Sequence, residues 1–188
     1  LAFGPDLVLA WDSGNPRRAV DQLRELGITT WSIEIRDPHE IPAFIDTVGR
    51  ATGHEADARA ESSRLRRQVA ELEHLYAGAK PLRYFNQVDA QPLFTINGQH
   101  LISRGRARGG GANFFADPGG VAFPVAHQSV GVANPDALIA PRLTGVDDPL
   151  AAWRDWPAMN AVRNQGLFLL SADEISRATP RFLDSLDQ

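Results

Sequence analysis

The sequence predicts an α/β protein with two Rossmann-like lobes joined by a long rigid helix. A strand–helix–strand unit opens the chain, a helical region follows it, and a second α/β region begins with a motif similar to the start of the first. We therefore expect an N-terminal lobe over residues 1–36, a helical linker over residues 37–80 and a C-terminal lobe over residues 81–188.

The first lobe is expected to contain two parallel strands with a helix between them. The apolar run from Asp6 to Trp11 predicts a buried strand. Asn15 is a favourable N-cap and Pro16 suits the first helical position, so a helix is expected to begin there and to end before Gly27. The β-branched segment from Ile28 to Ile35 predicts the second strand. A strand, a helix and a strand in this order favour parallel pairing.

The linker is expected to hold two helices. Asp37 and Glu40 have the spacing of a capped helix start, from which a first helix runs to about Gly53. A second helix spans His54 to Tyr76, and at 1.5 Å per residue it would be about 35 Å long. Its apolar residues form one stripe, made of Leu65, Val69, Leu72 and Tyr76. This pattern fits a rigid strut between two lobes, or a helix that lies along one larger sheet.

The second lobe is expected to alternate strands and helices. The expected elements are strands over Leu82–Val88, Pro92–Ile96 and Leu167–Leu170, and a helix over Gln99–Arg108. A further strand is expected in Asn134–Ala140, where Pro-Asp precedes an apolar run as it does in Gly4–Ala10. In both places a turn, a helix and a second apolar strand follow. This weak internal repeat indicates two lobes of similar build.

The charge distribution argues against a nucleic-acid partner. The formal net charge is −4, whereas binding to phosphates needs a concentrated positive field. The one basic cluster, Arg104, Arg106 and Arg108, precedes three glycines without the Lys-Ser/Thr of a phosphate loop, and we interpret it as a solvated helix end. No apolar run approaches the ~20 residues of a membrane span, so no direct membrane insertion is expected.

Signals for catalysis or metal binding are missing from the sequence. The absence of cysteine excludes disulfides, thiolate catalysis and cysteine-ligated metals. The histidines are scattered without a His-Glu-x-x-His pair, and no Gly-x-Ser-x-Gly elbow is present. We therefore expect no enzyme, no metal site and no cofactor. A small α/β enzyme is the less favoured alternative, because this fold class hosts many chemistries.

Short segments along nearly the whole chain carry a family resemblance. They are Pro5–Trp11, Gly14-Asn15, Val20–Leu23, Leu26–Ile28, Pro92–Thr95, Gly110–Phe115, Asn134–Asp136 and Arg177–Arg181. Through them the chain resembles the cobalamin-binding proteins of bacterial ABC importers, which belong to the chelate-binding proteins with a helical backbone. The tryptophan before Gly14-Asn15 and the closing Arg-Ala-Thr-Pro-Arg segment are its most specific parts.

The resemblance implies a solute-binding component of an ABC importer. Such a protein binds cobalamin or a similar corrinoid in the cleft between its lobes and delivers it to a permease in the inner membrane. The expected location is the periplasm, and haem or a ferric siderophore is the alternative ligand. By comparison with the family, we expect the first lobe to be N-terminally truncated, with residues 1–36 as its remainder, and we expect the chain to stop early in the last helix.

The first-lobe residues expected at the ligand are Trp11, Gly14, Asn15 and Trp31. Trp11 ends a strand, and the carboxyl ends of strands border the ligand crevice in open α/β sheets. A flat aromatic ring there can pack on a corrin; otherwise it packs into the core of its own lobe. Trp31 matches a family pocket aromatic only with an offset of one position, so core packing is an equal alternative.

The second-lobe residues expected at the ligand are Phe94, Phe123, Asp173 and Arg177. Phe123 lies between glycines and a proline, in a predicted loop. By resemblance, Asp173 and Arg177 lie at the cleft mouth and could hydrogen-bond the amides of a corrin. The alternatives are a helix N-cap for Asp173 and a salt bridge for Arg177.

The permease is expected to contact one charged stretch on each lobe. The family resemblance implies an acidic residue on each side, facing arginines of the permease. Here the first-lobe stretch contains Arg17 and Arg18, whereas Asp147 and Asp148 keep the acidic character of the second lobe. We therefore expect a changed charge pattern at Arg17; alternatively, the acid has moved to a neighbour such as Asp12 or Asp21.

Overall fold

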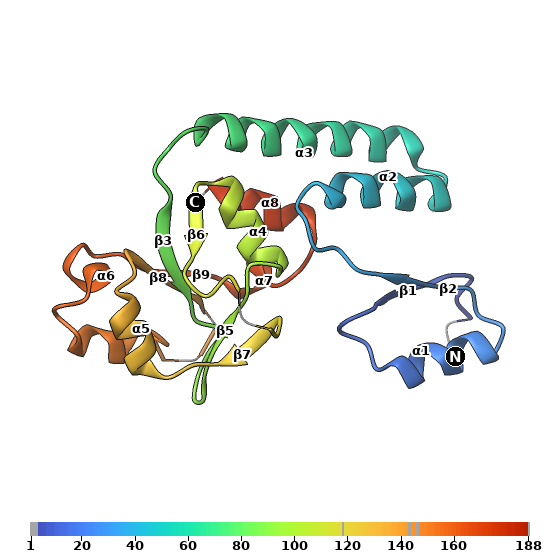
Figure 1. The fold of residues 1–188 in the computed structure, drawn as a ribbon. Helices are drawn as coiled ribbons and strands as arrows, with labels where there is room; N and C mark the ends of the chain where they lie inside the picture. Colours follow the sequence, from blue (N-terminus) through green and yellow to red (C-terminus); the bar gives the residue numbers. More distant parts are fainter. Residues whose placement is uncertain (1–3, 118, 143, 146, 188) are drawn as a thin grey trace. The chain divides into compact units, whose positions relative to one another are not determined.

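The computed structural model describes residues 4–117, 119–142, 144–145 and 147–187, and the chain folds into two compact units (Figure 1). The first unit ends at Ile35 and the second begins at Arg36. Both units contain parallel strands joined by helices, so the predicted α/β class is confirmed. None of the helices in these described ranges is both long enough and apolar enough to cross a bilayer.

The first unit is a two-stranded parallel sheet with one helix. Strand β1 (Val8–Trp11) pairs with β2 (Thr30–Ile33), and α1 (Arg17–Glu25) connects them. These elements confirm the strand–helix–strand prediction. Gly27 has a left-handed φ of 78°, which a helix C-terminus favours and which only glycine adopts without strain. The Ile28 amide then donates to Leu23 O at 3.0 Å and turns the chain towards β2.

The helix α1 lies on one face of this sheet. Arg24 donates from Nη2 to Ser32 Oγ at 2.9 Å, and Ala10 and Val20 are buried. Ala10 and Ser32 are register partners, so both project to the α1 side. The alternation of a strand places Leu9 and Trp11 on the opposite side.

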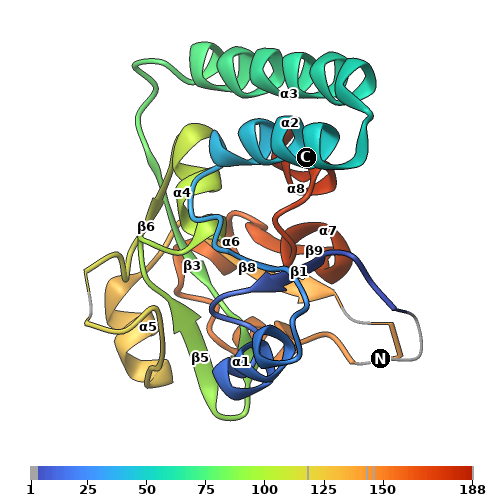
Figure 2. The same cartoon turned by 90° about the vertical axis from the view of Figure 1, so that its right-hand side faces the viewer.

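The second unit opens with the two predicted helices, α2 (Glu40–Thr52) and α3 (Glu55–Leu75), which lie side by side (Figures 1 and 2). Glu40 Oε2 accepts hydrogen bonds from the Arg36 and Asp37 amides at 2.8 and 3.4 Å, so the predicted contact between Asp37 and Glu40 is present. The helix itself begins later than predicted, because its N-cap residue is His39 rather than Asp37. The stripe on α3 is buried at Leu65, Val69 and Leu72, whereas Tyr76 is exposed. The prediction was therefore wrong for Tyr76, which follows the last helical turn.

Two sheets form the centre of the second unit. The parallel sheet has the order β6 (Gly111–Asn113), β3 (Leu82–Asn86), β8 (Ala137–Arg142) and β9 (Leu167–Ser171). The antiparallel sheet has the order β4 (Asp89–Ala90), β5 (Leu93–Ile96) and β7 (Ala122–Pro124). The parallel strands β3, β8 and β9 and the strand β5 were expected from the sequence. No pattern in the sequence indicated β4, β6 and β7, which are only two or three residues long.

Helices cover both faces of the parallel sheet. One face packs on α5 (His127–Ala133), the 3₁₀ helix η1 (Ala151–Asp155) and α6 (Asn160–Arg163), with a core that includes Phe85, Leu138 and Trp153. The other face carries Tyr84 and packs on α4 (Leu101–Arg108), α7 (Ala172–Ile175) and α8 (Pro180–Asp184), which a short 3₁₀ turn, η2 (Ser185–Asp187), follows. Layers of this kind are the doubly wound arrangement.

Candidate ligand-binding site

The turn after β1 holds Trp11 in a defined position. Asn15 Oδ1 accepts a hydrogen bond from the Trp11 amide at 2.6 Å, and the Asn15 amide donates to Trp11 O at 2.8 Å. Gly14 lies directly beside the indole, because a Cβ at this position would be 3.0 Å from Trp11 Cε3. The segment Trp11–Asn15 is therefore a small preorganised unit in which Gly14 and Asn15 have positioning roles.

A second contact fixes this turn to the neighbouring strand. Ser13 donates from its amide to Glu34 Oε2 at 2.9 Å and from its hydroxyl to Glu34 Oε1 at 3.2 Å. The Trp11 side chain remains 46% exposed at the carboxyl end of β1. Because the turn fixes the Trp11 backbone, the exposed indole can give its face to a flat ligand without rearrangement of the main chain.

Trp31 lies on the same sheet face as Trp11. Its register partner is Leu9, and Trp11 is partnered by Ile33, so all four side chains project away from α1. Leu9 and Trp31 are exposed within this unit, at 45% and 37%. Trp31 is thus not packed into the core formed with α1, which was its alternative role.

Phe94 and Phe123 lie on adjacent antiparallel strands but project to opposite faces of the small sheet. Phe94 pairs with Pro124 and Thr95 pairs with Phe123, and neighbouring residues of a strand alternate between faces. Phe123 shares its face with Thr95, which is fully buried and donates to Asn86 O at 2.7 Å. Phe123 lies in β7 rather than in the predicted loop, and both aromatic rings are half-buried.

An aromatic series that sequence reasoning did not single out continues from Phe123. The ring of Phe115 packs edge-on against Phe123, Phe114 and the core residue Phe85, with centroid distances of 6.4, 5.3 and 5.7 Å. Phe114 is 43% exposed and follows the last residue of β6. The doublet of phenylalanines after Gly110-Gly111-Ala112-Asn113 was visible in the sequence, but nothing there linked it to Phe123.

Asp173 and Arg177 pair with each other on the surface of the second unit. Arg177 Nη2 lies 3.4 Å from Asp173 Oδ1, and the side chains are 68% and 78% exposed. The salt-bridge alternative for Arg177 is therefore present. Asp173 does not cap α7, because the residue at the cap position is Ser171. An exposed pair of this kind is weak, so both groups can exchange their contact for a ligand.

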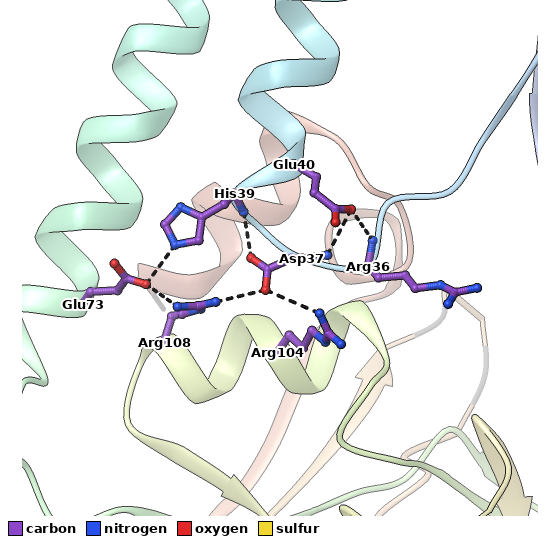
Figure 3. A network of polar contacts seen from close by, with 7 residues as sticks. All are labelled: Arg36, Asp37, His39, Glu40, Glu73, Arg104 and Arg108. Carbon is purple, nitrogen blue, oxygen red and sulfur yellow. Dashed lines mark hydrogen bonds and ion pairs between the residues drawn. The ribbon is translucent and has the colours of Figure 1, made fainter.

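The basic cluster of α4 is not a solvated helix end, which corrects the sequence interpretation (Figure 3). Arg108 donates from Nη1 to Glu73 Oε1 at 2.7 Å and from Nη2 to Asp37 Oδ2 at 3.0 Å. Arg104 lies 3.7 Å from the same Asp37 oxygen, and His39 Nε2 lies 3.0 Å from Glu73 Oε1. These residues join the start of α2, the long helix α3 and the helix α4.

The electrostatics of this cluster favour charged carboxylates. Burial alone would raise the pKa of Asp37, but the His39 amide and the Arg108 guanidinium outweigh it, and the pKa lies below its ordinary value. Burial likewise opposes the charge on Glu73, whereas His39 and Arg108 lower the pKa of that carboxyl. The network therefore links α3 to α4 and to the start of α2, and its arginines Arg104 and Arg108 are already paired with carboxylates.

The residues expected to face a permease occupy different surroundings. Arg17 is exposed and begins α1. Asp147 is exposed, whereas Asp148 accepts from the Leu150 amide at 2.9 Å and pairs with Arg154 at 2.5 Å. Burial would raise the pKa of Asp148, but the Leu150 amide and Arg154 lower it. Of the two acids, Asp147 has the more accessible carboxylate.

Metal ligands do not gather anywhere in the described ranges, where no group of three or more histidine, aspartate or glutamate side chains could hold an ion. Each unit carries aromatic or polar groups that a ligand could reach. The first unit has Trp11 and Trp31, and the second has the half-buried Phe94 and Phe123 and the exposed Phe114, Asp173 and Arg177. Such surfaces suit a large, partly flat ligand with polar edges.

Known proteins match the chain over its whole length. It is 32% identical over 190 residues to the vitamin B12-binding protein of Vibrio cholerae, covering 100% of this chain and 68% of that protein. It is 33% identical over 189 residues to the vitamin B12-binding protein of Yersinia pestis, covering 100% of this chain and 65% of that protein. The chain thus spans about two thirds of the length of these relatives. No protein-family model matches it.

Solved structures give the same result for the fold. The crystal structure of the periplasmic vitamin B12-binding protein BtuF of Vibrio cholerae matches with a TM-score of 0.89 at 30% identity, covering 100% of this chain and 73% of that chain. The periplasmic haem-binding protein BhuT with two haems matches with a TM-score of 0.84 at 22% identity, covering 99% of this chain and 74% of that chain. At the latter identity the likeness concerns the fold alone.

Proposed function

The chain belongs to the family of the vitamin B12-binding proteins, and on this basis we propose that it is the solute-binding part of an ABC importer for a corrinoid. The observation that carries the proposal is the exposed tryptophan that ends β1, whose backbone the following turn fixes. The Trp11–Asn15 segment, which the resemblance singled out, holds an exposed indole through Asn15 and Gly14. A corrin ring offers the flat apolar area that this indole can cover.

The polar periphery of a corrinoid has partners in the second unit. Its amide side chains both donate and accept hydrogen bonds, and Asp173 and Arg177 supply an acceptor and a donor on one short segment. Phe114 and Phe123, which both contact the ring of Phe115, supply apolar area in the same unit. Capture in this scheme is stoichiometric binding without a catalytic step, in keeping with relatives that are named as binding proteins.

The location and the partner follow from the same proposal. A solute-binding protein of this family acts in the periplasm and releases its ligand to a permease in the inner membrane. Arg17 on the first unit and Asp147 on the second are the exposed charges that would meet the permease. Charge pairing of this kind sets orientation and encounter rate more than affinity.

Retention of cyanocobalamin tests the proposal. The protein is incubated with cyanocobalamin, desalted, and examined by its visible absorbance spectrum. A corrin spectrum that stays with the protein in stoichiometric amount is expected. A haem spectrum retained after incubation with haemin, with no corrinoid retained, would instead assign the alternative ligand to the same fold.

A further inference from the structure

The second unit contains a cavity that the corrinoid proposal does not use. Its volume is about 230 Å³, and it lies between the parallel sheet and the helices α4, α7 and α8. Most of its wall is apolar, including Leu82, Ile102, Ile139, Leu170, Phe182 and Leu186. None of the residues assigned to corrinoid or permease contacts lines it. The volume is too small for a corrin but suits a small organic molecule.

One charged group, Arg106 of α4, projects into this apolar wall. Arg104 and Arg108 face Asp37 and Glu73, whereas Arg106 lies two residues away on the helix and faces the sheet. Its Nη1 donates to Asn86 Oδ1, and its guanidinium lies 5.5 Å from the centroid of the Tyr84 ring. The cavity therefore has one cationic side in a lining that is mostly apolar.

Arg106 Nη2 is buried without a hydrogen-bond partner in the described part of the chain. The hydroxyl of Tyr84 is also buried, with the Ser103 side chain beside it, and both Arg106 and Tyr84 line the cavity. Both atoms can donate a hydrogen bond. Buried donors are nearly always satisfied in folded proteins, so the unpaired Arg106 Nη2 on the cavity wall points to an acceptor that occupies the cavity.

The missing acceptor should be an anion. Among the side chains that the structure describes, no carboxylate lines the cavity and none pairs with Arg106. Burial disfavours the charged guanidinium and lowers the pKa of Arg106 to about 10, yet it stays protonated at neutral pH. A buried cation without a counter-ion is costly, whereas a carboxylate could accept from Arg106 and Tyr84 together.

We propose that this cavity is a second ligand site, which binds a small monocarboxylic acid with an apolar body. The carboxylate accepts hydrogen bonds from Arg106 Nη2 and the Tyr84 hydroxyl. The hydrocarbon part packs against Ile139, Leu170 and Phe182. The site lies within the second unit alone and is independent of the corrinoid contacts, so either proposal can fail without the other.

Titration calorimetry with linear acids tests the site. Butanoate, hexanoate and octanoate are the probes, with 1-hexanol as the uncharged control. Saturable binding of the acids is expected, with affinity rising about fourfold per added methylene until the cavity is full. The alcohol should bind at least about tenfold more weakly than hexanoate, because it cannot form the charge-assisted contact.

Two cavity variants and one matched control complete the experiment. Arg106→Leu should weaken hexanoate binding at least about tenfold, and Tyr84→Phe, which removes only the hydroxyl, about fivefold. Arg67→Leu removes an exposed arginine of α3 and should leave binding unchanged. No binding of any acid, equal binding of alcohol and acid, or full affinity in both cavity variants would overturn the proposal.

Discussion

Arg108 donates from Nη1 to Glu73 Oε1 at 2.7 Å, and this ion pair joins the end of α4 to the long helix α3. Nη2 of the same guanidinium donates to Asp37 Oδ2, and Asp37 precedes α2. One side chain therefore ties together three helices of the second unit (Figure 3). If the long helix is as rigid as predicted, its rigidity depends on the Arg108–Glu73 ion pair as well as on the buried residues Leu65, Val69 and Leu72.

Removing the guanidinium should destabilise the second unit. We expect Arg108→Met to lower the free energy of unfolding by about 1–3 kcal/mol, because Asp37, only 16% exposed, loses its closest cation. Chemical denaturation measures the effect. Arg67→Met, at an exposed position of α3, is the matched control and should stay within about 0.5 kcal/mol of the parent. Equal stability of the two variants would contradict a stabilising role for the network.

The same network should make stability depend on acid pH. The folded pKa values of Asp37 and Glu73 lie below their ordinary values of about 4, so the unfolded state takes up protons first as the pH falls. The stabilisation is therefore complete above about pH 5 and is lost as the pH falls through the folded pKa values. Between pH 6 and pH 3, the free energy of unfolding should fall less steeply in Asp37→Asn and in Arg108→Met than in the parent protein. The same pH dependence of the free energy of unfolding in all three proteins would show that these carboxylates do not cause it.

The contact between α2 and α3 should not tolerate a methyl group at Gly49. An added Cβ would lie 2.2 Å from Ala58 Cβ and 3.1 Å from His54 O. Alanine would gain up to about 1 kcal/mol of helix propensity, but we expect the cost of overpacking to be larger. The free energy of unfolding should therefore fall by about 1–2 kcal/mol. The double variant Gly49→Ala with Ala58→Gly should recover part of the loss. An unchanged free energy of unfolding in Gly49→Ala would show that α2 and α3 can move apart without cost.

The charge at Arg17 should decide which permease is recognised. We expect the protein to bind its own permease and not the permease of a relative that carries an acid at this place. Arg17→Glu should reverse the preference, and added salt should weaken both interactions. Pull-down against both permeases measures this. Equal binding that responds neither to the substitution nor to salt would eliminate the charge argument.

Local elements were predictable because their signals are local. The periodic stripe of α3, the cap of α2 and the strand–turn–helix around Trp11 all depend on residues within a few positions of one another. Gly14 and Asn15 were expected at the ligand, which stays a prediction. The structure shows a different relationship, in which Asn15 hydrogen-bonds the Trp11 backbone and Gly14 lies close to the indole.

Long-range relationships could not be predicted in the same way. Asp37 and Arg108 are separated by 71 positions, so the basic cluster of α4 was interpreted without its partners. The strands β4 and β7 are too short for a period of two to be visible. The link from Phe114 through Phe115 to Phe123 depends on how β6 and β7 are placed, which only the fold determines.

The most direct test of the central claim is a calorimetric titration with cyanocobalamin, compared between the parent protein and Trp11→Ala. We expect saturation at one corrinoid per protein, and a loss of about 1–3 kcal/mol of binding free energy in the variant, because the indole no longer covers the ring. No heat with any corrinoid, together with saturation by haemin or a ferric siderophore, would contradict the corrinoid assignment. An unchanged affinity in Trp11→Ala would remove Trp11 from the site.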